Sequence, residues 1–326
     1  MTFLLPSSRL RFIGGNAGLF RFALLTLVIL VFAVTLDSFG SSRNAYALLQ
    51  AFALLGLVSL GLAATMLVGE FDLSVGSMVA VSGLITLKVG GSDHLLGGVL
   101  AAVAFAAAVG LFNALVFAWL RLSSLVITVG TMIALSGFAY WLAGGKVINT
   151  ENFDAGSLLD DSILGFFSVR SLLTLGMFLL MYLLLKYTRL GRNIFATGSK
   201  ALAAKASGVS TTRVYIFVFV FSSVCAALAG SLLSISLATA SATMGSNLLL
   251  QAASAAIVGG IALSGGVGGV GGVLVGVLIL TALNNGLSLW GASAAAIAFA
   301  NGMVLLLVVM FDGRLGHWFR TRTAQA

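Results

Sequence analysis

The 326-residue sequence contains few charged side chains and a single cysteine. Only 8% of its residues are charged, whereas charged residues make up about 25% of an average soluble domain. Hydrophobic residues account for 60% of the chain, which is more apolar surface than one buried core of this length can remove from water. The composition therefore excludes a soluble enzyme, a disordered chain and a fibre. It predicts an all-α integral membrane protein surrounded by the lipid bilayer.

The residues that usually carry metal sites and catalysis are also scarce. Because Cys225 is the only cysteine, an internal disulfide is excluded, and no Cys/His cluster has the spacing of a metal-ligand set. Cys225 lies within the apolar run FVFVFSSVCAALAG, which favours a small buried residue over a reactive thiol. The two histidines, His94 and His317, are isolated. We therefore predict that the protein is not an enzyme and holds no metal.

Ten apolar stretches approach the roughly 20 residues that a helix needs to cross a bilayer. The first five are Leu19–Leu36, Ala45–Val68, Leu73–Val89, Leu95–Leu120 and Leu122–Ala143. The second five are Val169–Tyr187, Val214–Leu237, Leu248–Leu263, Val270–Leu289 and Ala292–Phe311.

Basic residues gather on alternate connections between these stretches. If the N-terminus is cytoplasmic, 13 of the 17 Lys and Arg residues fall in cytoplasmic segments, as the positive-inside rule requires. This predicts about ten transmembrane helices with both termini cytoplasmic, in one polytopic domain that covers residues 1–326. The same distribution accounts for the net charge of +8 without nucleic acid as a partner.

Two connections are long enough to have functions of their own. The predicted outer loop, residues 144–168, carries four acidic residues and is either a solvated hairpin or a contact for a partner; these are Glu151, Asp154, Asp160 and Asp161. The predicted cytoplasmic loop, residues 188–213, is basic and contains KALAAKA (Lys200–Ala206), a run of strong helix formers. Ser199 is placed to cap this short helix and Gly208 to end it. The helix is either a solvated surface turn or a docking element for a cytoplasmic protein.

Ordered motifs resemble one family of transporters. The cytoplasmic stretch GRNIFATGSKALAAKASGVSTTRVY (Gly191–Tyr215) resembles the coupling loop of permease subunits from bacterial ABC sugar importers of the ribose, xylose, arabinose and galactose type. GEFDLSVGSMVAVSG (Gly69–Gly83), RLSSLVITVGTM (121–132) and AAIVGGIALSGGVGGVGGVLVGVLILTALNNGL (Ala255–Leu287) are similar to further segments of these permeases, in the same order. The resemblance covers most of residues 45–311.

The resemblance implies a type II ABC-importer-like permease in the bacterial inner (plasma) membrane, which imports a monosaccharide or related polyol by alternating access. The implied partners are ATP-binding cassette ATPase subunits, a periplasmic or extracellular sugar-binding protein, and a second permease copy or a similar permease. The chain has no G-x-x-x-x-G-K-[ST] loop. ATP and Mg would therefore bind to the partner ATPase, and this chain would hold no cofactor.

The resemblance also assigns the ATPase contacts to the cytoplasmic loop. The implied residues are Arg192, Gly198, Ser199, Lys200, Ala203, Ala204, Lys205, Ser207 and Gly208. The chain departs from the family in two places. Leu202 stands where an acidic residue is common, which leaves the partner contacts open, and Ser123 and Ser124 replace a usual proline before the fifth span, which leaves a helix break there open.

One glycine-rich segment matches G-x-G-x-x-G, the sequence fingerprint of dinucleotide sites. It runs from Gly266 to Gly271. The segment lacks a strand–turn–helix context, and the next acidic residue, Asp312, lies far beyond the roughly 20 residues that the fingerprint requires. We therefore interpret these glycines as a tight turn with close helix contact between spans eight and nine.

Two acidic residues, Glu70 and Asp72, lie at the predicted inner end of span two. Charge at membrane level is costly and often functional. In one interpretation Asp72 is the N-cap of span three, with Ser74 nearby, and Glu70 is solvated or paired with a basic residue. In the other, one of the two acids serves as a proton site. The second interpretation makes the protein a stand-alone proton-coupled secondary sugar carrier.

Neutral polar residues within the spans are candidates for the solute path, because a sugar hydroxyl needs hydrogen-bonding groups; interhelical hydrogen bonds are the alternative use. Spans three and eight are short and hold matching places in the two groups of five, which often marks the path. The candidates, with the motif around Asp72, are Glu70, Asp72, Ser74, Gly76, Asn113, Thr128, Asn284, Asn285 and Asn301.

Overall fold

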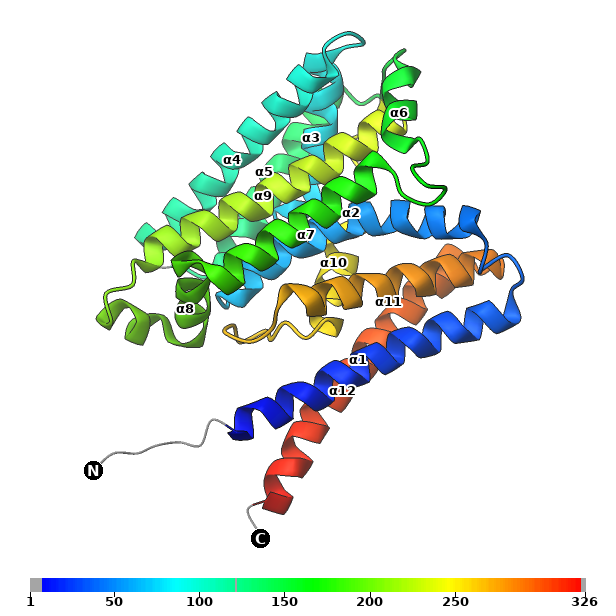
Figure 1. Cartoon of the computed structure of the whole chain (residues 1–326). Helices are drawn as coiled ribbons and strands as arrows, with labels where there is room; N and C mark the ends of the chain where they lie inside the picture. Colours follow the sequence, from blue (N-terminus) through cyan, green and yellow to red (C-terminus); the bar gives the residue numbers. More distant parts are fainter. Residues whose placement is uncertain (1–7, 121, 324–326) are drawn as a thin grey trace.

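The computed structural model describes residues 8–120 and 122–323 and consists almost entirely of α-helices (Figure 1). The first six helices are α1 (Ser8–Thr35), α2 (Ser42–Leu67), α3 (Val75–Gly90), α4 (Leu95–Leu120), α5 (Ser124–Ala143) and α6 (Phe153–Asp160). The next six are α7 (Val169–Tyr187), α8 (Arg189–Ala206), α9 (Thr211–Ser236), α10 (Leu248–Val258), α11 (Val270–Leu289) and α12 (Ala294–Thr323). Two short strands, β1 (Ile148–Asn149) and β2 (Thr239–Ala240), pair antiparallel, with Ile148 opposite Ala240.

Seven of the described helices are long and apolar enough to cross a membrane: α1, from Gly18 onward, α2, α4, α5, α7, α9 and α11. Three further apolar helices are shorter, namely α3, α10 and the first part of α12, Ala294–Met310. These elements lie where the ten apolar stretches are predicted and agree with an all-α, multi-pass membrane protein. The count of ten crossings stays a prediction. Residues 1–7 and 324–326, whose cytoplasmic location is predicted, lie outside the described residues.

The core of the molecule is formed around α9, which packs against α2, α3 and α4. The helix α3 lies deepest, because 13 of its 16 residues are buried. A helix that is apolar on every side is typical of a bundle interior. Its sequence, VGSMVAVSGLITLKVG, accordingly mixes apolar with small residues and keeps its one charge, Lys88, for the last turn.

Close packing in this core depends on glycine. A Cβ atom at Gly230 of α9 would lie 2.1 Å from the carbonyl oxygen of Val79 in α3, and one at Gly110 of α4 would lie 2.6 Å from the carbonyl oxygen of Phe219 in α9. Small residues let helix backbones approach in this way inside membranes. The glycine-rich composition therefore serves helix contact at these two positions.

The outer surface of the bundle is apolar. Val34 of α1 and Trp119 of α4 are each 83% exposed, and Trp141 of α5 is 74% exposed. A surface of this kind is costly in water and is compatible with lipid.

The structure corrects the predicted eighth span. The stretch Leu248–Leu263 is not one helix, because α10 ends at Val258 after 11 residues. Gly260 follows with φ +86°, a left-handed conformation that glycine adopts without strain. A connection from 259 to 269 then leads into α11. The glycines that match G-x-G-x-x-G lie in this connection and in the first turn of α11, and Gly266 and Gly268 have φ values of +73° and +129°, as a tight turn requires. The close contact between α10 and α11 is made instead by Gly259 and Gly272, outside the motif, since nothing lies within 4 Å of a Cβ at Gly269 or Gly271.

A break also precedes α5 although no proline is present. The helix α4 ends at Leu120, and α5 begins at Ser124 with Ser123 in the cap position. The two serines thus stand at a helix boundary.

The connection between α5 and α7 is more structured than a solvated hairpin. It contains β1 and the helix α6, which begins where the Asn152 side chain accepts a hydrogen bond from the N–H of Ala155 at 3.0 Å. Asp160, at the end of α6, forms an ion pair with Arg170 of α7, with 2.8 Å between Oδ1 and Nε. The same Nε lies 2.9 Å from Oε1 of Gln50 in α2, and the hydroxyl of Ser236 in α9 donates to Asp160. This set, Gln50, Asp160, Arg170 and Ser236, fastens α6 to three core helices.

Candidate coupling and translocation site

The helix α8 lies at the opposite end of the bundle from α6 (Figure 1). It begins at Arg189, where the Thr188 hydroxyl accepts a hydrogen bond from the N–H of Gly191 at 3.1 Å. Gly191 is in turn packed against α7, since a Cβ atom there would lie 2.4 Å from the carbonyl oxygen of Leu185. These contacts set the sharp turn from α7 into α8.

The predicted short helix is the second half of this longer helix. The structure places the break inside α8, where Lys200 has the non-helical angles φ −163° and ψ 96°. A short helical segment therefore starts directly after Lys200, one residue later than a start capped by Ser199, and ends at Ala206 as predicted. The sequence did not predict the helical segment that precedes it, RLGRNIFATGS, which begins after the N-cap Thr188.

The predicted end of the helix is confirmed. Gly208 has φ +85°, the N–H of Gly208 bonds to the carbonyl of Lys205 at 3.0 Å, and the N–H of Val209 bonds to the carbonyl of Ala204 at 3.0 Å. This pair of bonds is the Schellman arrangement that ends helices at a left-handed glycine.

Most of the predicted coupling residues are accessible. The exposed ones are Arg192, Ser199, Lys200, Ala203, Lys205, Ser207 and Gly208, whereas Gly198 is half-buried and Ala204 is buried. Leu202, which the sequence shows only as a departure from the family, is 80% exposed. It is the one large apolar side chain on the outer face of the second half of α8. In the sequence, Leu202 is the only large apolar residue in KALAAKA, and this pattern could have predicted an exposed apolar contact.

The connection between α2 and α3 carries the predicted acidic pair. The prediction that Asp72 is the N-cap of the third span is wrong by two residues, since Ser74 occupies the cap position of α3. Asp72 Oδ1 instead accepts hydrogen bonds from the backbone N–H of Ser74, at 3.1 Å, and from its hydroxyl. Asp72 is fully buried and its Oδ2 has no hydrogen-bond partner. Ser222 of α9 lies near this carboxyl, although no hydrogen bond joins them within 3.5 Å.

Glu70 lies closer to the surface and is half-buried. Burial raises the pKa of its carboxyl, and a hydrogen bond with the Ser124 side chain partly offsets that rise. The same end of α5 holds the backbone of Phe71, whose N–H donates to the Ser124 hydroxyl at 3.2 Å and whose carbonyl accepts from Thr128 at 3.2 Å. The first turns of α5 therefore fix the path of this connection, which is a structural use for Thr128.

A chain of hydrogen bonds leads from Asp72 into the membrane region between α4 and α5. The side-chain amide of Asn113 in α4 donates to the Ser74 hydroxyl at 3.2 Å, and the hydroxyl of Thr131 in α5 donates to Asn113 Oδ1 at 2.7 Å. Asp72, Ser74, Asn113 and Thr131 thus form one polar track. Thr131 was missed in the sequence; its position one turn after Thr128 in the motif RLSSLVITVGTM is the signal that could have found it.

The polar track ends at a groove between α4 and α5. The groove has a volume of about 700 Å³ and contains Phe112, Val126, Phe138 and other apolar side chains. Thr131 supplies the only side-chain hydroxyl among the groove residues. The groove can therefore accept apolar surface and offer one hydrogen bond.

Among the described residues, no group of three or more His, Cys, Asp or Glu side chains is placed to hold a metal ion.

Residues 44–311 match the family described as the permease component of the branched-chain amino acid transport system. The chain belongs to this family of transport permeases. The family provides membrane components of transport systems and is not a family of enzymes. No solved structure matches this permease significantly.

Two similar proteins are import permeases. The permease is 31% identical to the ribose import permease protein of Escherichia coli (strain K12), over 90% of this chain and 92% of that protein. It is 34% identical to the autoinducer 2 import system permease protein of Yersinia pseudotuberculosis serotype O:3 (strain YPIII), over 94% of this chain and 87% of that protein. These relatives favour a subunit of an import system over a stand-alone proton-coupled carrier.

The permease does not bring all the predicted path residues together. Asn285 of α11 donates to Asn44 Oδ1 at 2.8 Å, at the first turn of α2. Asn284, and Asn301 of α12, have side-chain oxygens without a hydrogen-bond partner. In the chain described here, α11 and α12 pack with α1, α2, α7 and α10, away from the groove between α4 and α5. Gly76 of α3 is used for packing, because a Cβ there would lie 3.2 Å from Cβ of Leu249 in α10.

Proposed function

We propose that this permease forms the translocation path of an ATP-driven importer and that α8 receives the motion of a separate ATPase. The observation that carries the proposal is the form of α8. It is anchored by its first half, kinked at Lys200, and presents small side chains and Leu202 to solvent. A short helix with an exposed apolar anchor suits docking into a groove of a partner protein.

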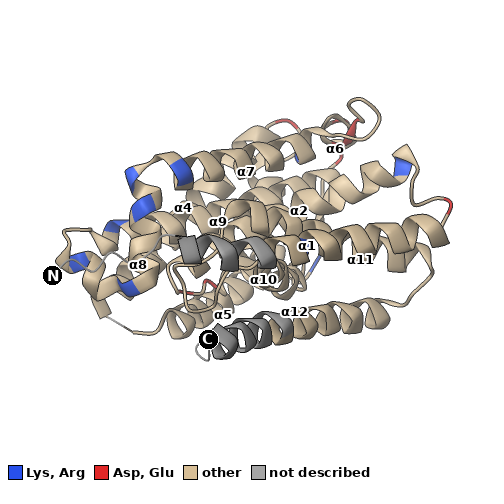
Figure 2. Cartoon of the chain, turned by 60° about the horizontal axis from the view of Figure 1, so that its bottom comes forward, with Lys and Arg blue, Asp and Glu red and all other residues tan. Residues whose placement is uncertain are grey.

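The proposed topology has ten crossings with both termini cytoplasmic, in the inner (plasma) membrane of a bacterium, and residues 1–326 act as one type II ABC-importer-like domain. Charge supports this orientation. Most Lys and Arg gather around α8 and the neighbouring helix ends, whereas most of the acidic residues lie at the far end, on the side of α6 (Figure 2). Basic residues favour the cytoplasmic side of a membrane.

The proposed ATPase contact is the second half of α8 with its flanking residues. Lys200, Ala203, Lys205, Ser207 and Gly208 surround Leu202 on the accessible surface. Small side chains let the partner approach the helix backbone, and the lysines hold it at the basic face. ATP and Mg would bind to the ATPase subunits and not to this chain.

Replacing Leu202 with alanine is expected to weaken ATPase binding about tenfold, because the loss of one buried leucine side chain costs about 1.5 kcal/mol or more. Affinity between the purified ATPase and the permease in nanodiscs measures the effect. Leu164→Ala is the matched control, because Leu164 is 81% exposed and lies in the connection after α6, at the other end of the bundle. Equal binding by both variants and the unchanged protein would show that Leu202 is not at the interface.

Two further partners belong to the proposal. A secreted or periplasmic binding protein would deliver the solute to the α6 end of the molecule. A second copy, or a similar permease, would cover the open side of the groove between α4 and α5 and enclose the path, with Thr131 contributing a hydroxyl. Asn284, Asn285 and Asn301 would then serve mainly in helix contacts.

The proposed solute is a monosaccharide or a related polyol. The family description names branched-chain amino acids, whereas the named relatives import ribose or autoinducer 2. Beyond the Asp72 carboxyl, the polar track offers hydroxyl and amide groups from Ser74, Asn113 and Thr131, which suit a hydroxylated solute. An amino acid has both a carboxylate and an ammonium group, and no exposed ion pair lines the groove. Competition by unlabelled ribose, polyols and leucine against uptake by the complete system distinguishes these classes.

The energy source provides the decisive test. Uptake by cells that express the permease with its partners is expected to collapse when ATP is depleted. It is expected to persist when an uncoupler dissipates the proton gradient while ATP is maintained. The reverse pattern would overturn the proposal and support proton coupling through Glu70 or Asp72.

A further inference from the structure

The backbones of three separate segments meet at Gly198, in the last turn of α8 before its kink. A Cβ atom at Gly198 would lie 2.0 Å from the carbonyl oxygen of Leu67, the last residue of α2, and 2.6 Å from the backbone nitrogen of Gly266. These two neighbours are themselves joined, since the N–H of Gly266 donates to the Leu67 carbonyl at 2.8 Å. The contact involves main chain on all three sides and leaves no room for a side chain.

Two more glycines extend this contact. A Cβ atom at Gly265 would lie 2.6 Å from the nitrogen of Gly69 and 3.0 Å from the carbonyl oxygen of Gly198. Gly69, Gly265 and Gly266 also have φ values of +82°, +79° and +73°, so they combine close approach with left-handed turns. Gly69, Gly198, Gly265 and Gly266 are called the glycine junction below. It joins α8 to the α2–α3 connection and to the α10–α11 connection.

The position of the glycine junction along α8 is informative. Lys200, two residues after Gly198, interrupts the helix, and the segment beyond it carries the exposed Leu202. The segment that would contact a partner is therefore linked to the membrane helices at the kink. Side chains can absorb small displacements by changing rotamer, but a contact between backbones transmits them, because no flexible group lies between.

The elements beyond the glycine junction are tightly connected as well. A Cβ at Gly276 of α11 would lie 2.1 Å from the carbonyl oxygen of Ala255 in α10, so these helices are in backbone contact. The helix α10 also contacts α3, because Leu249 packs on Gly76. A displacement at Gly266 would thus reach α10 and α11 together, and then the start of α3 with its polar track.

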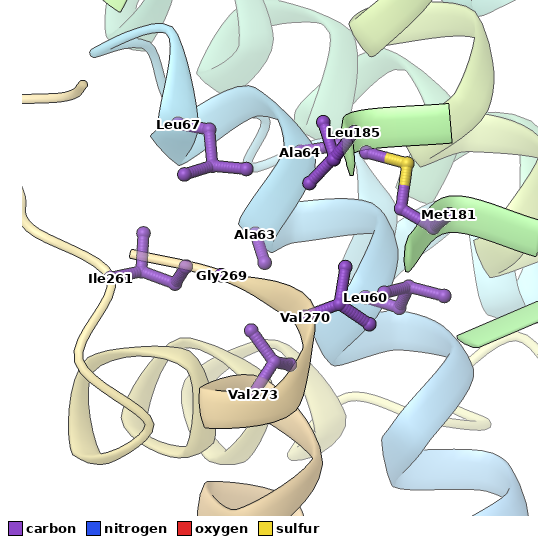
Figure 3. Close-up of a pocket in the computed structure, with 10 residues that line it drawn as sticks. All are labelled: Leu60, Ala63, Ala64, Leu67, Met181, Leu185, Ile261, Gly269, Val270 and Val273. Carbon is purple, nitrogen blue, oxygen red and sulfur yellow. The ribbon is translucent and has the colours of Figure 1, made fainter. Parts of the chain in front are cut away.

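Leu67, whose carbonyl oxygen contacts the glycine junction, also lines a small apolar cavity (Figure 3). Leu67 of α2, Met181 and Leu185 of α7, and Ile261 and Val270 from the α10–α11 segment line it, with a volume of about 10 Å³. It has no polar group to hold water and is far too small for a sugar.

We propose that the glycine junction transmits movement of the second half of α8 to α2 and to the α10–α11 connection. The inference rests on the proposed docking of an ATPase to α8 and adds the route by which that docking acts on the path. Gly69, Gly198, Gly265 and Gly266 are positioning residues that do not touch the solute. Their spacing in three distant motifs is explained by one contact in space.

The first test is Gly198→Ala in the assembled importer, with permease, ATPase and binding protein in proteoliposomes. The added methyl group forces the backbones of α2 and the α10–α11 connection away from α8. ATPase binding is expected to stay within about twofold of the unchanged protein, while solute uptake per ATP hydrolysed falls about tenfold, within the range by which single residues alter coupling. Gly176→Ala on α7 is the control, since nothing lies within 4 Å of a Cβ there. Unchanged uptake per ATP in Gly198→Ala would overturn the proposal.

A second measurement needs no substitution at the junction and so does not depend on folding of the glycine variant. Cys225 is buried, so spin labels can be directed to Ala206→Cys, an exposed position in the second half of α8 that leaves Leu202 in place, and to Val267→Cys, which replaces an exposed side chain. The proposal expects ATP binding to leave the distance between labels 206 and 267 unchanged, while a label at Leu164→Cys moves relative to both. A change in the 206–267 distance would show that α8 moves independently and would overturn the proposal. Wild-type uptake that does not require ATP would instead reject the proposed function.

Discussion

Replacing Gly230 with alanine is expected to destabilise the permease by about 3 kcal/mol or more, because overpacking a core contact typically costs about 1–3 kcal/mol and here the opposing atoms belong to backbone. The added Cβ would lie 2.1 Å from the carbonyl oxygen of Val79 and 3.0 Å from its Cα. Neither atom can move aside without separating α3 from α9. Since α9 also packs on α2 and α4, the displacement spreads through the core.

Thermal unfolding in mild detergent, followed by the loss of the monodisperse peak, measures this cost. Gly176→Ala is the matched control, because it makes the same chemical change in a helix where nothing lies within 4 Å of the new atom. Alanine favours helix over glycine by about 1 kcal/mol in water, so this control should be as stable as the unchanged protein or slightly more so. Equal stability of the two variants would show that the backbones of α3 and α9 are farther apart at Gly230 than in this structure.

Much of the helical architecture follows from hydropathy alone. The boundaries of α4, α7 and α11 coincide with the predicted stretches because apolar runs there end at clear polar or glycine boundaries. Spans are long and uniform in composition, so the 20-residue criterion finds them without tertiary information. The predicted multi-pass class and the permease family are confirmed on that basis and by the comparison with relatives.

The errors lie where glycine connects helices. Leu248–Leu263 is mostly apolar, with Gln251 and Ser254 as its polar residues, and hydropathy cannot distinguish a helix from an extended connection in such a run. The helix α10 ends at Val258 because Gly260, two residues later, adopts the left-handed conformation with φ +86°. In α8 the kink at Lys200 lies two residues after Gly198, which contacts α2 and the α10–α11 connection. That contact joins residues far apart in the sequence, so local propensity does not report it.

Among the candidate site residues, those that depend on local sequence are predicted well and those that depend on packing are not. The coupling residues lie in one continuous motif, and their exposure follows from a local helix with a glycine stop. The polar track does not: Asp72 and Ser74 meet Asn113 and Thr131 only because α3, α4 and α5 pack together. Asn284 and Asn301 have the same side-chain chemistry as Asn113, yet they lie elsewhere. The residue type makes each asparagine a candidate for the solute path, but only the packing of the helices determines which of them joins the polar track.

Arg170→Ala is expected to release α6 from the bundle and to cost about 3 kcal/mol, since removing one partner of a largely buried ion pair leaves the other charge uncompensated. The Arg170 side chain is 8% exposed and that of Asp160 is 27% exposed. The guanidinium also holds Gln50, whose Oε1 accepts from the Ser168 hydroxyl at 3.0 Å. Loss of Arg170 therefore loosens α6, the start of α7 and the middle of α2 together.

Hydrogen exchange of the α6 amides and thermal stability both report this release. Lys146→Ala is the control, because it removes the same charge from an exposed position of the same connection, and it should change neither measurement. Uptake should fall in Arg170→Ala if α6 helps to receive a binding protein, because the outer surface would no longer be held in one arrangement.

A second substitution separates the cost of the unpaired charge from the loss of packing. In Arg170→Ala the Asp160 carboxylate faces Ser236 and Gln50 without a cation, and Asp160→Asn would remove that charge while keeping two hydrogen-bonding groups. The double variant is therefore expected to recover part of the stability lost in Arg170→Ala, although Asp160→Asn alone is destabilising. If the two losses simply add, the residues do not act as a pair, and α6 is held mainly by the Tyr46 hydroxyl, which donates to the backbone carbonyl of Asp160. In that case Tyr46→Phe, and not Arg170→Ala, should free the helix.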